Sequence, residues 1–310
     1  MVNRVGIITL GGIGIGIGSF FVLQSASQAI PGAMDTSGNI VHNAEAFIAP
    51  ASQTTYSPIR DFNIPEPQLH ARSGILIDGN SHRVLFAKNP DQKLPIASIT
   101  KLMTALVVLE DLDINQVYTV TAEDLNIDGN GADFTQGEQL RGTELMKIML
   151  VKSSNDAASV FATSAYRDGV DFVGLMNQKA ARLGMSSTHF SDPAGLNDAE
   201  TYSTASDVGK LVRAAMQKEF LREVTETPWI DVPTLEGTVY HVINTNLLLS
   251  LLPDILLGKT GNTTGALGTM ALAIAVDGEN YLISVVLGSE DRFGETKKLI
   301  DWGKQAHTWN

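Results

Sequence analysis

The chain has 310 residues but no cysteine, and its basic residues are few. Without cysteine there can be no disulfide bond, no thiolate nucleophile and no cysteine-ligated metal. Lysine and arginine number 22 against 34 acidic residues, which gives a formal net charge of −12. Nucleic-acid binding depends on neutralising phosphates, and this chain has no concentrated basic run, so we expect no nucleic-acid partner.

Two catalytic signatures are also missing. The six histidines are scattered, without the spacing that zinc motifs use, so no metal site is expected. No G-x-S-x-G sequence is present, which disfavours an α/β-hydrolase. Apolar material, in contrast, is plentiful: 44% of the residues are hydrophobic, which is enough for a sizeable core in one large domain or two small ones.

The N-terminal stretch is apolar. No charged residue occurs from Val5 to Leu23, a length close to the roughly 20 residues that span a bilayer. Arg4 precedes this stretch and the next basic residue is Arg60, so the positive-inside rule places the rest of the chain outside the cytoplasm. Residues 1–30 are therefore interpreted as either a cleaved signal peptide or a retained membrane anchor. The protein is expected to be secreted, or held at the outer face of the membrane by this segment.

Strand patterns lie at both ends of the remaining sequence, and helical patterns lie between them. The predicted strands are residues 73–78, 83–87, 269–276 and 281–288. The last two are joined by Asp277-Gly278, a strong hairpin signal. This order favours an α/β protein of the α+β type, with an antiparallel sheet from both chain ends and an inserted helical subdomain. Residues 31–69 are expected to be a polar, proline-containing linker and residues 70–310 the folded domain.

Ser98 and Lys101 lie three residues apart at the start of an apolar helical pattern. On a helix, positions i and i+3 share one face. A serine is a weak nucleophile unless a base lies beside it, and a lysine with a lowered pKa can be that base. Taken alone, the spacing is more typical of a helix N-cap serine followed by a surface lysine than of a catalytic pair.

Two further motifs supply what such a pair needs. Ser153-Ser154-Asn155 falls where the helical pattern of residues 143–165 is interrupted, so its polar side chains can project into a cleft. Lys259-Thr260-Gly261 ends an apolar strand; its glycine permits close approach of a substrate backbone, and its lysine adds positive charge. Ser37-Gly38-Asn39 also has the S-x-N spacing, but it lies in the predicted linker and precedes Ser98.

S-x-x-K, S-x-N and K-T-G in this order are the signature of the penicillin-binding proteins and serine β-lactamases. From about Ser73 to Gly303 the chain resembles the low-molecular-weight D-alanyl-D-alanine carboxypeptidases. The segments that carry the resemblance are Pro-Ile-Ala-Ser-Ile-Thr-Lys-Leu-Met-Thr-Ala, Val-Lys-Ser-Ser-Asn-Asp-Ala-Ala, Asp-Pro-Ala-Gly-Leu, Tyr-Ser-Thr-Ala-Ser-Asp, Asn-Thr-Asn-Leu-Leu and Lys-Lys-Leu-Ile-Asp-Trp-Gly. The resemblance implies a β-lactamase/transpeptidase-like fold, with residues 70–310 as the catalytic domain.

The resemblance also implies catalytic roles. Ser98 would be the acylated nucleophile. Lys101 would be its base, kept at least partly neutral by burial and by a second cation, Lys259. Ser153 would relay a proton to or from the leaving amine. Asn155 would position side chains and the amide backbone of the substrate.

Substrate-binding roles follow from the same resemblance. The oxyanion hole would consist of the backbone N–H groups of Ser98 and of Asn262, the residue after the K-T-G glycine. Thr260 would meet the terminal carboxylate of the substrate. Arg292 would share that task, because an arginine fork suits a carboxylate. The alternative for Arg292 is a surface residue capped by Asp291.

The implied activity is that of a serine-type D-Ala-D-Ala carboxypeptidase, which removes the terminal D-Ala from peptidoglycan stem peptides through an acyl-serine intermediate. No cofactor is expected, and β-lactam antibiotics would acylate the same serine. A D,D-endopeptidase that cuts peptidoglycan crosslinks is the closest alternative. A β-lactamase and a non-catalytic penicillin or wall-peptide binder are the others.

Two features of the sequence bear on these alternatives. The carboxypeptidases usually continue after K-T-G to an Ala-Gly-Tyr-like segment, whereas residues 264–268 are Thr-Gly-Ala-Leu-Gly. The pocket wall there is therefore expected to differ. A class A β-lactamase needs a glutamate that activates the deacylating water, and Glu200 is interpreted instead as a solvated loop acid.

Overall fold

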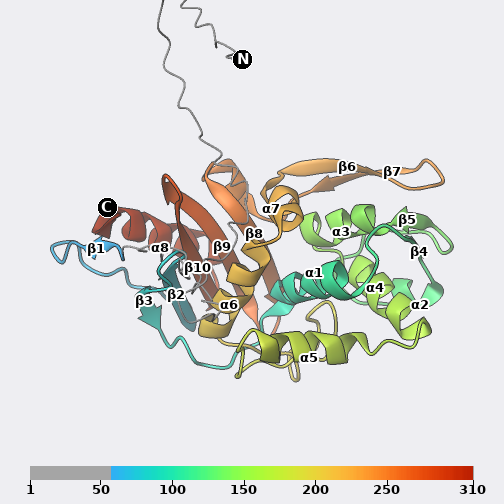
Figure 1. Cartoon of the computed structure of the whole chain (residues 1–310), viewed down its shortest axis with the longest axis horizontal. Coiled ribbons are helices and arrows are strands. Elements are labelled where there is room, and N and C mark those ends of the chain that lie inside the picture. Colours follow the sequence, from blue (N-terminus) through green and yellow to red (C-terminus); the bar gives the residue numbers. More distant parts are fainter. Residues whose placement is uncertain (1–56, 310) are drawn as a thin grey trace, which may run out of the picture. The chain divides into compact units, whose positions relative to one another are not determined.

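A five-stranded antiparallel sheet forms the centre of the molecule (Figure 1). The computed structural model describes residues 57–309. The sheet consists of β2 (Ser73–Asp78), β3 (Val84–Lys88), β8 (Ile255–Thr263), β9 (Leu267–Asp277) and β10 (Asn280–Ser289), in the order β3–β2–β10–β9–β8. Because β2 pairs with β10, strands from the two ends of the domain are neighbours. The predicted sheet is confirmed.

The helical subdomain is inserted between β3 and β8, as predicted. Its helices are η1 (Ala97–Ile99), α1 (Thr100–Asp111), α2 (Ala122–Leu125), α3 (Gly142–Val151), α4 (Asn155–Arg167), α5 (Phe172–Arg182), α6 (Ala205–Met216), α7 (Glu219–Glu226) and η2 (Leu247–Ser250). Two hairpins accompany them, β4 (Val117–Thr119) with β5 (Gln139–Arg141), and β6 (Trp229–Pro233) with β7 (Val239–Ile243). The last helix, α8 (Arg292–Ala306), returns to pack on the sheet.

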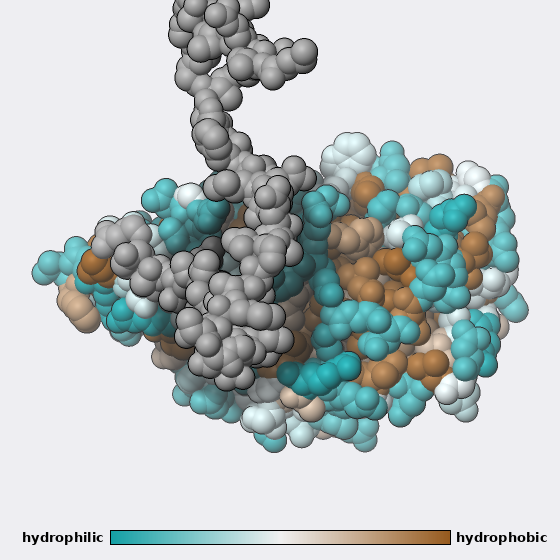
Figure 2. Space-filling view, in the orientation of Figure 1, coloured by the Kyte–Doolittle hydropathy of each residue, from teal (hydrophilic) through white to brown (hydrophobic). Residues whose placement is uncertain are grey.

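The two faces of the sheet bury different side chains, because successive residues of a strand point to opposite faces. On β2, Ile75 joins the large core shared with the helical subdomain, whereas Leu76 joins a smaller core beneath α8. On the side seen in Figure 2, hydrophilic residues cover much of the described surface, and hydrophobic residues gather over the helical subdomain on the right of the view. The sheet therefore separates two apolar layers, and β8 remains as an edge strand beside the helices.

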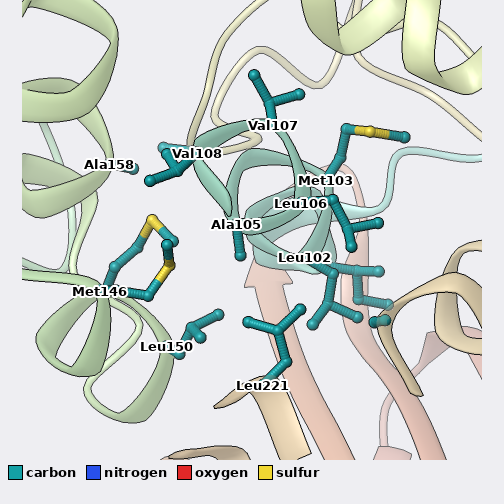
Figure 3. Packing of buried hydrophobic residues seen from close by; sticks show 14 of the residues in the cluster. Leu102, Met103, Ala105, Leu106, Val107, Val108, Met146, Leu150, Ala158 and Leu221 are labelled. Carbon is teal, nitrogen blue, oxygen red and sulfur yellow. The ribbon is translucent and has the colours of Figure 1, made fainter. Parts of the chain in front are cut away.

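Helix α1 is the central helix of the larger core. Nine of its 12 residues are buried, and Figure 3 shows their side chains pointing to different sides, toward Met146 and Leu150 of α3, Ala158 of α4 and Leu221 of α7. A helix that is apolar on all sides is stable only when other elements surround it. Its first turn, which carries Lys101, is consequently held by packing on every side.

The ends of the described chain are joined. Strand β1 (Ile59–Arg60), which lies within the predicted linker 31–69, pairs with β11 (His307–Thr308) after α8. Trp309 Nε1 also donates a hydrogen bond of 2.7 Å to Asp78 Oδ1. The predicted signal peptide or anchor, residues 1–30, lies outside the described residues. Across residues 57–309, no helix combines the length and the hydropathy needed to cross a membrane.

Candidate active site

Ser98 and Lys101 lie where η1 passes into α1. Ser98 is partly exposed, whereas Lys101 is fully buried. Lys101 Nζ lies 2.9 Å from Ser98 Oγ, 2.8 Å from Asn155 Oδ1 and 3.0 Å from the carbonyl oxygen of Ala194. The amide and carbonyl oxygens can only accept hydrogen bonds, so two N–H groups of Lys101 are directed away from the serine. The remaining position on the nitrogen faces Ser98 Oγ.

Burial is the largest influence on the charge of Lys101. It lowers the pKa of this amine from 10.5 to about 7, and the carboxylates of Asp192 and Asp156 partly oppose the shift. Removal from water disfavours an ammonium, while nearby negative charge favours it. Near neutral pH, a substantial fraction of Lys101 is therefore a neutral amine with a free lone pair.

The turn that carries Ser98 is held between two glycines from distant parts of the chain. A Cβ on Gly195 would overlap the carbonyl oxygen of Ala97, and a Cβ on Gly261 would lie 2.9 Å from both the Ser98 nitrogen and the Ala97 Cβ. Ala97 itself has a φ of 49°, in the left-handed region. Only glycine permits these approaches, so the position of the nucleophile is fixed by backbone contacts on two sides.

The S-x-N motif occupies the break between α3 and α4. Ser153 lies in the break with a φ of 62°, and Asn155 is the first residue of α4. Asn155 Nδ2 donates to the carbonyl oxygen of Asp128 at 2.9 Å, and its backbone N–H donates to that of Asn130 at 2.7 Å. The Asn155 side chain, whose Oδ1 accepts from Lys101, is thus oriented by the second hydrogen bond that its Nδ2 donates.

The K-T-G lysine faces the S-x-N serine. Lys259 is buried on β8, and its Nζ donates to Ser153 Oγ at 2.8 Å and to the carbonyl oxygen of Thr260 at 2.9 Å. Burial, followed by the positive charges of Lys101 and Arg292, lowers the pKa of Lys259 well below 10.5. The sequence interpretation gave Lys259 a share in keeping Lys101 neutral. Burial is the first cause of the lowered pKa at both lysines, and the positive charge of Lys101 adds to it at Lys259.

The predicted carboxylate-binding residues, Thr260 and Arg292, lie on β8 and at the start of α8. Thr260 Oγ1 is 2.7 Å from Thr245 Oγ1, a partner that sequence reasoning did not identify. Arg292 is half-buried at the start of α8, and its Nε has no hydrogen-bond partner among the described residues. Asp291 accepts from the Gly294 N–H at 2.9 Å as the helix N-cap. A half-buried guanidinium with a free donor matches an anion-binding role better than the alternative of a capped surface residue.

The loop of residues 191–203 completes the surroundings of Lys101. The Asp192 carboxylate accepts hydrogen bonds from the backbone N–H groups of Ala194, Gly195 and Leu196 at 2.5–3.2 Å. This turn presents the Ala194 carbonyl to Lys101. Sequence reasoning used Asp-Pro-Ala-Gly-Leu only as a mark of resemblance. In the same loop Glu200 is exposed and accepts from Asn197 Nδ2 at 3.0 Å, so it is no buried base.

A cavity of about 720 Å³ adjoins the site between α2, α4, α5 and the 191–203 loop. Its lining includes Asn155 and Ala194, both of which contact Lys101, together with Leu196 and Asn197. The loop that holds Lys101 therefore has open space behind part of it. Within residues 57–309, no three histidine or acidic side chains group as a metal site would require.

The fold and the three converging motifs define a serine acyl-transfer enzyme of the penicillin-binding type. A family model described as D-alanyl-D-alanine carboxypeptidase, peptidase S11, matches residues 61–291. The chain belongs to this family. Members of this family act on the cell wall outside the cytoplasm; their substrates are peptidoglycan peptides, and β-lactams bind to them. The predicted family and enzyme class, a serine D-Ala-D-Ala carboxypeptidase, are confirmed.

Individual relatives agree with this assignment. The chain is 32% identical over 248 residues to the D-alanyl-D-alanine carboxypeptidase DacB2 of Mycobacterium tuberculosis, covering 78% of this chain and 84% of the relative. It is 32% identical over 260 residues to the D-alanyl-D-alanine endopeptidase of Pseudomonas aeruginosa, covering 81% and 83%. Several other related carboxypeptidases are longer, and the chain spans 61 to 68% of their length.

A solved structure has a similar fold. The Streptomyces K15 DD-transpeptidase is 26% identical and superposes with a TM-score of 0.72, covering 77% of this chain and 99% of the transpeptidase. The likeness confirms the β-lactamase/transpeptidase-like fold that the motifs implied.

Proposed function

We propose that the chain cleaves the terminal D-Ala–D-Ala bond of peptidoglycan stem peptides with Ser98 as nucleophile and Lys101 as base. The hydrogen bonding of Lys101 is the observation that carries the proposal. Two acceptor-only oxygens take two N–H groups of the amine, and the free position of a neutral nitrogen then faces the hydroxyl of Ser98 at 2.9 Å. Such a geometry suits removal of the serine proton during attack.

Acylation follows from this arrangement. Ser98 Oγ bonds to the carbonyl carbon of the penultimate D-Ala while its proton passes to Lys101 Nζ. The developing oxyanion is received by the backbone N–H groups of Ser98 and Asn262. As the C–N bond breaks, the proton that Lys101 accepted is delivered through Ser153 to the leaving D-Ala nitrogen, which returns Lys101 to its neutral form; Lys259 contacts Ser153 at 2.8 Å. Water then attacks the acyl-serine, with Lys101 again as base, and releases the shortened peptide.

Binding of the substrate's terminal carboxylate is assigned to Thr260 and Arg292. Thr260 follows Lys259 on β8, and the charge of Arg292 lowers the pKa of Lys259 further, after burial and the charge of Lys101. A carboxylate bound there raises the pKa of Lys259 toward its ordinary value, because the anion offsets the repulsion. The substrate thereby keeps Lys259 protonated, so that its ammonium donates a hydrogen bond to Ser153 Oγ while the leaving amine takes up a proton.

Endopeptidase activity is the second candidate, supported by the Pseudomonas relative of that name. The same acyl-serine chemistry would cut a crosslink whose leaving amine belongs to a second peptide. A β-lactamase is disfavoured because Glu200, the one candidate for a deacylating glutamate, is exposed and bonded to Asn197. A non-catalytic binder would have no need for a buried amine beside its serine.

Residues 1–30 are proposed to direct the catalytic domain, residues 70–310, to the outer face of the membrane. Two forms of the segment remain, a cleaved signal peptide and a retained anchor. The intact mass of the protein recovered from membranes separates them, because cleavage near residue 30 removes about 3 kDa at roughly 110 Da per residue.

The activity is tested by incubating the full chain with a pentapeptide ending in D-Ala-D-Ala and with a crosslinked peptide dimer, and following free D-Ala and monomer by mass spectrometry. Ser98→Ala is the matched control, and a fluorescent penicillin reports acylation. D-Ala release that depends on Ser98 supports the proposal. Release that persists in Ser98→Ala refutes the mechanism, and crosslink cleavage without D-Ala release assigns the endopeptidase instead.

A further inference from the structure

Asp198 connects the 191–203 loop to the end of β8 and the turn that follows it, and the proposed chemistry gives this residue no role. It lies in the 191–203 loop, which also supplies the carbonyl that binds Lys101. Thr263 Oγ1 donates to Asp198 Oδ1 at 2.6 Å, and the Gly265 N–H donates to Oδ2 at 2.9 Å. Thr263 ends β8, and Gly265 lies in the turn to β9. The carboxylate therefore connects the loop to the strand that carries the K-T-G motif.

The order of residues along β8 places this connection relative to a bound peptide. If Thr260 binds the terminal carboxylate, the scissile carbonyl lies at Ser98, whose nitrogen packs against Gly261. The residues that precede the scissile bond must then continue in the opposite direction from the carboxylate, past Asn262 and toward Thr263. Asp198 consequently lies at the acyl-side end of the cleft. This step rests on the proposed function.

At this end the loop is also held by hydrogen bonds within itself, because the N–H groups of Glu200 and Thr201 donate to the Asn197 carbonyl oxygen. Its first half is held from within by the backbone hydrogen bonds to Asp192. Behind it lies the cavity of about 720 Å³, whose lining includes Leu196 and Asn197. The fit to the turn is close, since a Cβ on Gly265 would lie 2.7 Å from Asp198 Oδ2. The bonds of Asp198 add a connection from this outer part of the loop to β8 and to the turn that follows it.

We propose that Asp198 is a positioning residue that sets specificity on the acyl side of the cleft. By fastening the loop to the β8–β9 turn, it preorganises the wall along which the residues before the terminal D-Ala-D-Ala lie. Peptides with several such residues gain contacts from that wall, whereas a minimal substrate does not reach it. The residues after K-T-G depart from the usual Ala-Gly-Tyr-like segment at this same turn, which Thr263 and Gly265 now fasten to Asp198.

The test compares two substrates of the full chain, N-acetyl-D-Ala-D-Ala and a peptide with three residues before its D-Ala-D-Ala. Asp198→Ala is expected to lower kcat/KM for the longer peptide about tenfold, mainly through KM, because the surface that this peptide contacts would no longer be preorganised. The short substrate is expected to change less than about twofold, because its acyl group ends before the wall. Asp198→Asn, which keeps an acceptor oxygen, is expected to be intermediate.

Glu200→Ala provides the matched control, because Glu200 is an exposed carboxylate in the same loop. It is expected to leave both substrates unchanged. Equal losses for the two substrates in Asp198→Ala would show a merely structural role and overturn the proposal, as would no loss for either or the same selective loss in Glu200→Ala. Labelling by fluorescent penicillin verifies that each variant is folded. Failure of the proposed function is distinct, because the parent chain would then release D-Ala from neither peptide.

Discussion

Replacing Asn155 by aspartate tests the role of Lys101 with almost no change of shape. The Asn155 side chain is buried, and its Oδ1 lies 2.8 Å from Lys101 Nζ. A carboxylate oxygen in that place would favour the ammonium form of the lysine and raise the pKa of Lys101. A base must be neutral to act, so the variant is expected to need a higher pH than the parent.

The size of the shift follows from the geometry. A hydrogen bond to a charged partner contributes about 1.5–3 kcal/mol, and each pKa unit corresponds to about 1.4 kcal/mol, so the expected rise is about one to two units. The pKa of Lys101 would move from about 7 to about 8–9. At pH 7 the neutral fraction of Lys101 falls from about one half to between about 10% and 1%, which predicts an about five- to fiftyfold lower rate of acylation.

The assay is the pH profile of kcat/KM for D-Ala release, because this parameter reports ionisations of the free enzyme. In the parent chain, activity should rise with pH and reach half its plateau near pH 7, since the neutral amine accumulates as pH passes the pKa. In Asn155→Asp the midpoint should lie one to two units higher, by about the shift derived above. The aspartate also loses the bond that Asn155 Nδ2 makes to the Asp128 carbonyl, which lowers the plateau without moving the midpoint. A midpoint that stays near pH 7 would refute the assignment of Lys101 as base.

Three further predictions follow from the same contacts. Lys101→Met should abolish D-Ala release. In urea unfolding, the free energy of unfolding of the parent should rise by up to a few kcal/mol relative to this variant between pH 7 and 10, because the unfolded lysine binds more protons than the buried one. If the free energies of unfolding of the two proteins changed in parallel with pH, this prediction would be contradicted. Gly195→Ala should prevent penicillin labelling, because its Cβ would overlap backbone, whereas Gly137→Ala should retain it, since both glycines have positive φ but nothing lies within 4 Å of the position at 137. Thr245→Val removes the partner of the Thr260 hydroxyl at 2.7 Å and should raise KM about three- to tenfold for peptides with a free terminal carboxylate, but not for peptides amidated there.

The sheet could be predicted because its strands carry local signals. The Asp277-Gly278 turn signal predicts the β9–β10 hairpin, and the predicted strands on either side of it are apolar runs of ordinary length. The β6–β7 hairpin was not predicted. Its outer face carries Trp229, Val239 and Ile243, all more than half exposed, so the alternation of apolar and polar residues is hidden. Pro233 at the end of β6 also argues against a strand. The pairing of β1 with β11 involves only two residues each, too few for any pattern.

The candidate site divides in a similar way. Side chains within S-x-x-K, S-x-N and K-T-G could be found because each motif places chemically suited groups at fixed spacing. The Ala194 carbonyl, which accepts a hydrogen bond from Lys101, could not be predicted, because every residue has a backbone carbonyl whatever its type. Asp192 and Asp198 bind mainly backbone N–H groups, together with the hydroxyls of Thr201 and Thr263, and neither kind of partner gives a recognisable sequence pattern. The charge of Lys101 depends on its complete burial, which is a property of the packed core around α1 rather than of the motif.

Several features around Ser98 would each, by itself, lower the stability of the folded domain. Ala97 and Ser153 have side chains yet adopt positive φ, which costs about 1–2 kcal/mol at each position. Lys101 and Lys259 are two amines buried within one cleft, where water cannot solvate their charge. Such strain persists only where the surrounding structure is firmly packed, and α1 with its buried side chains provides that packing. The same burial lowers the pKa of Lys101 into the range where it can serve as a base, so the apolar core determines the chemistry of the site as well as the stability of the domain.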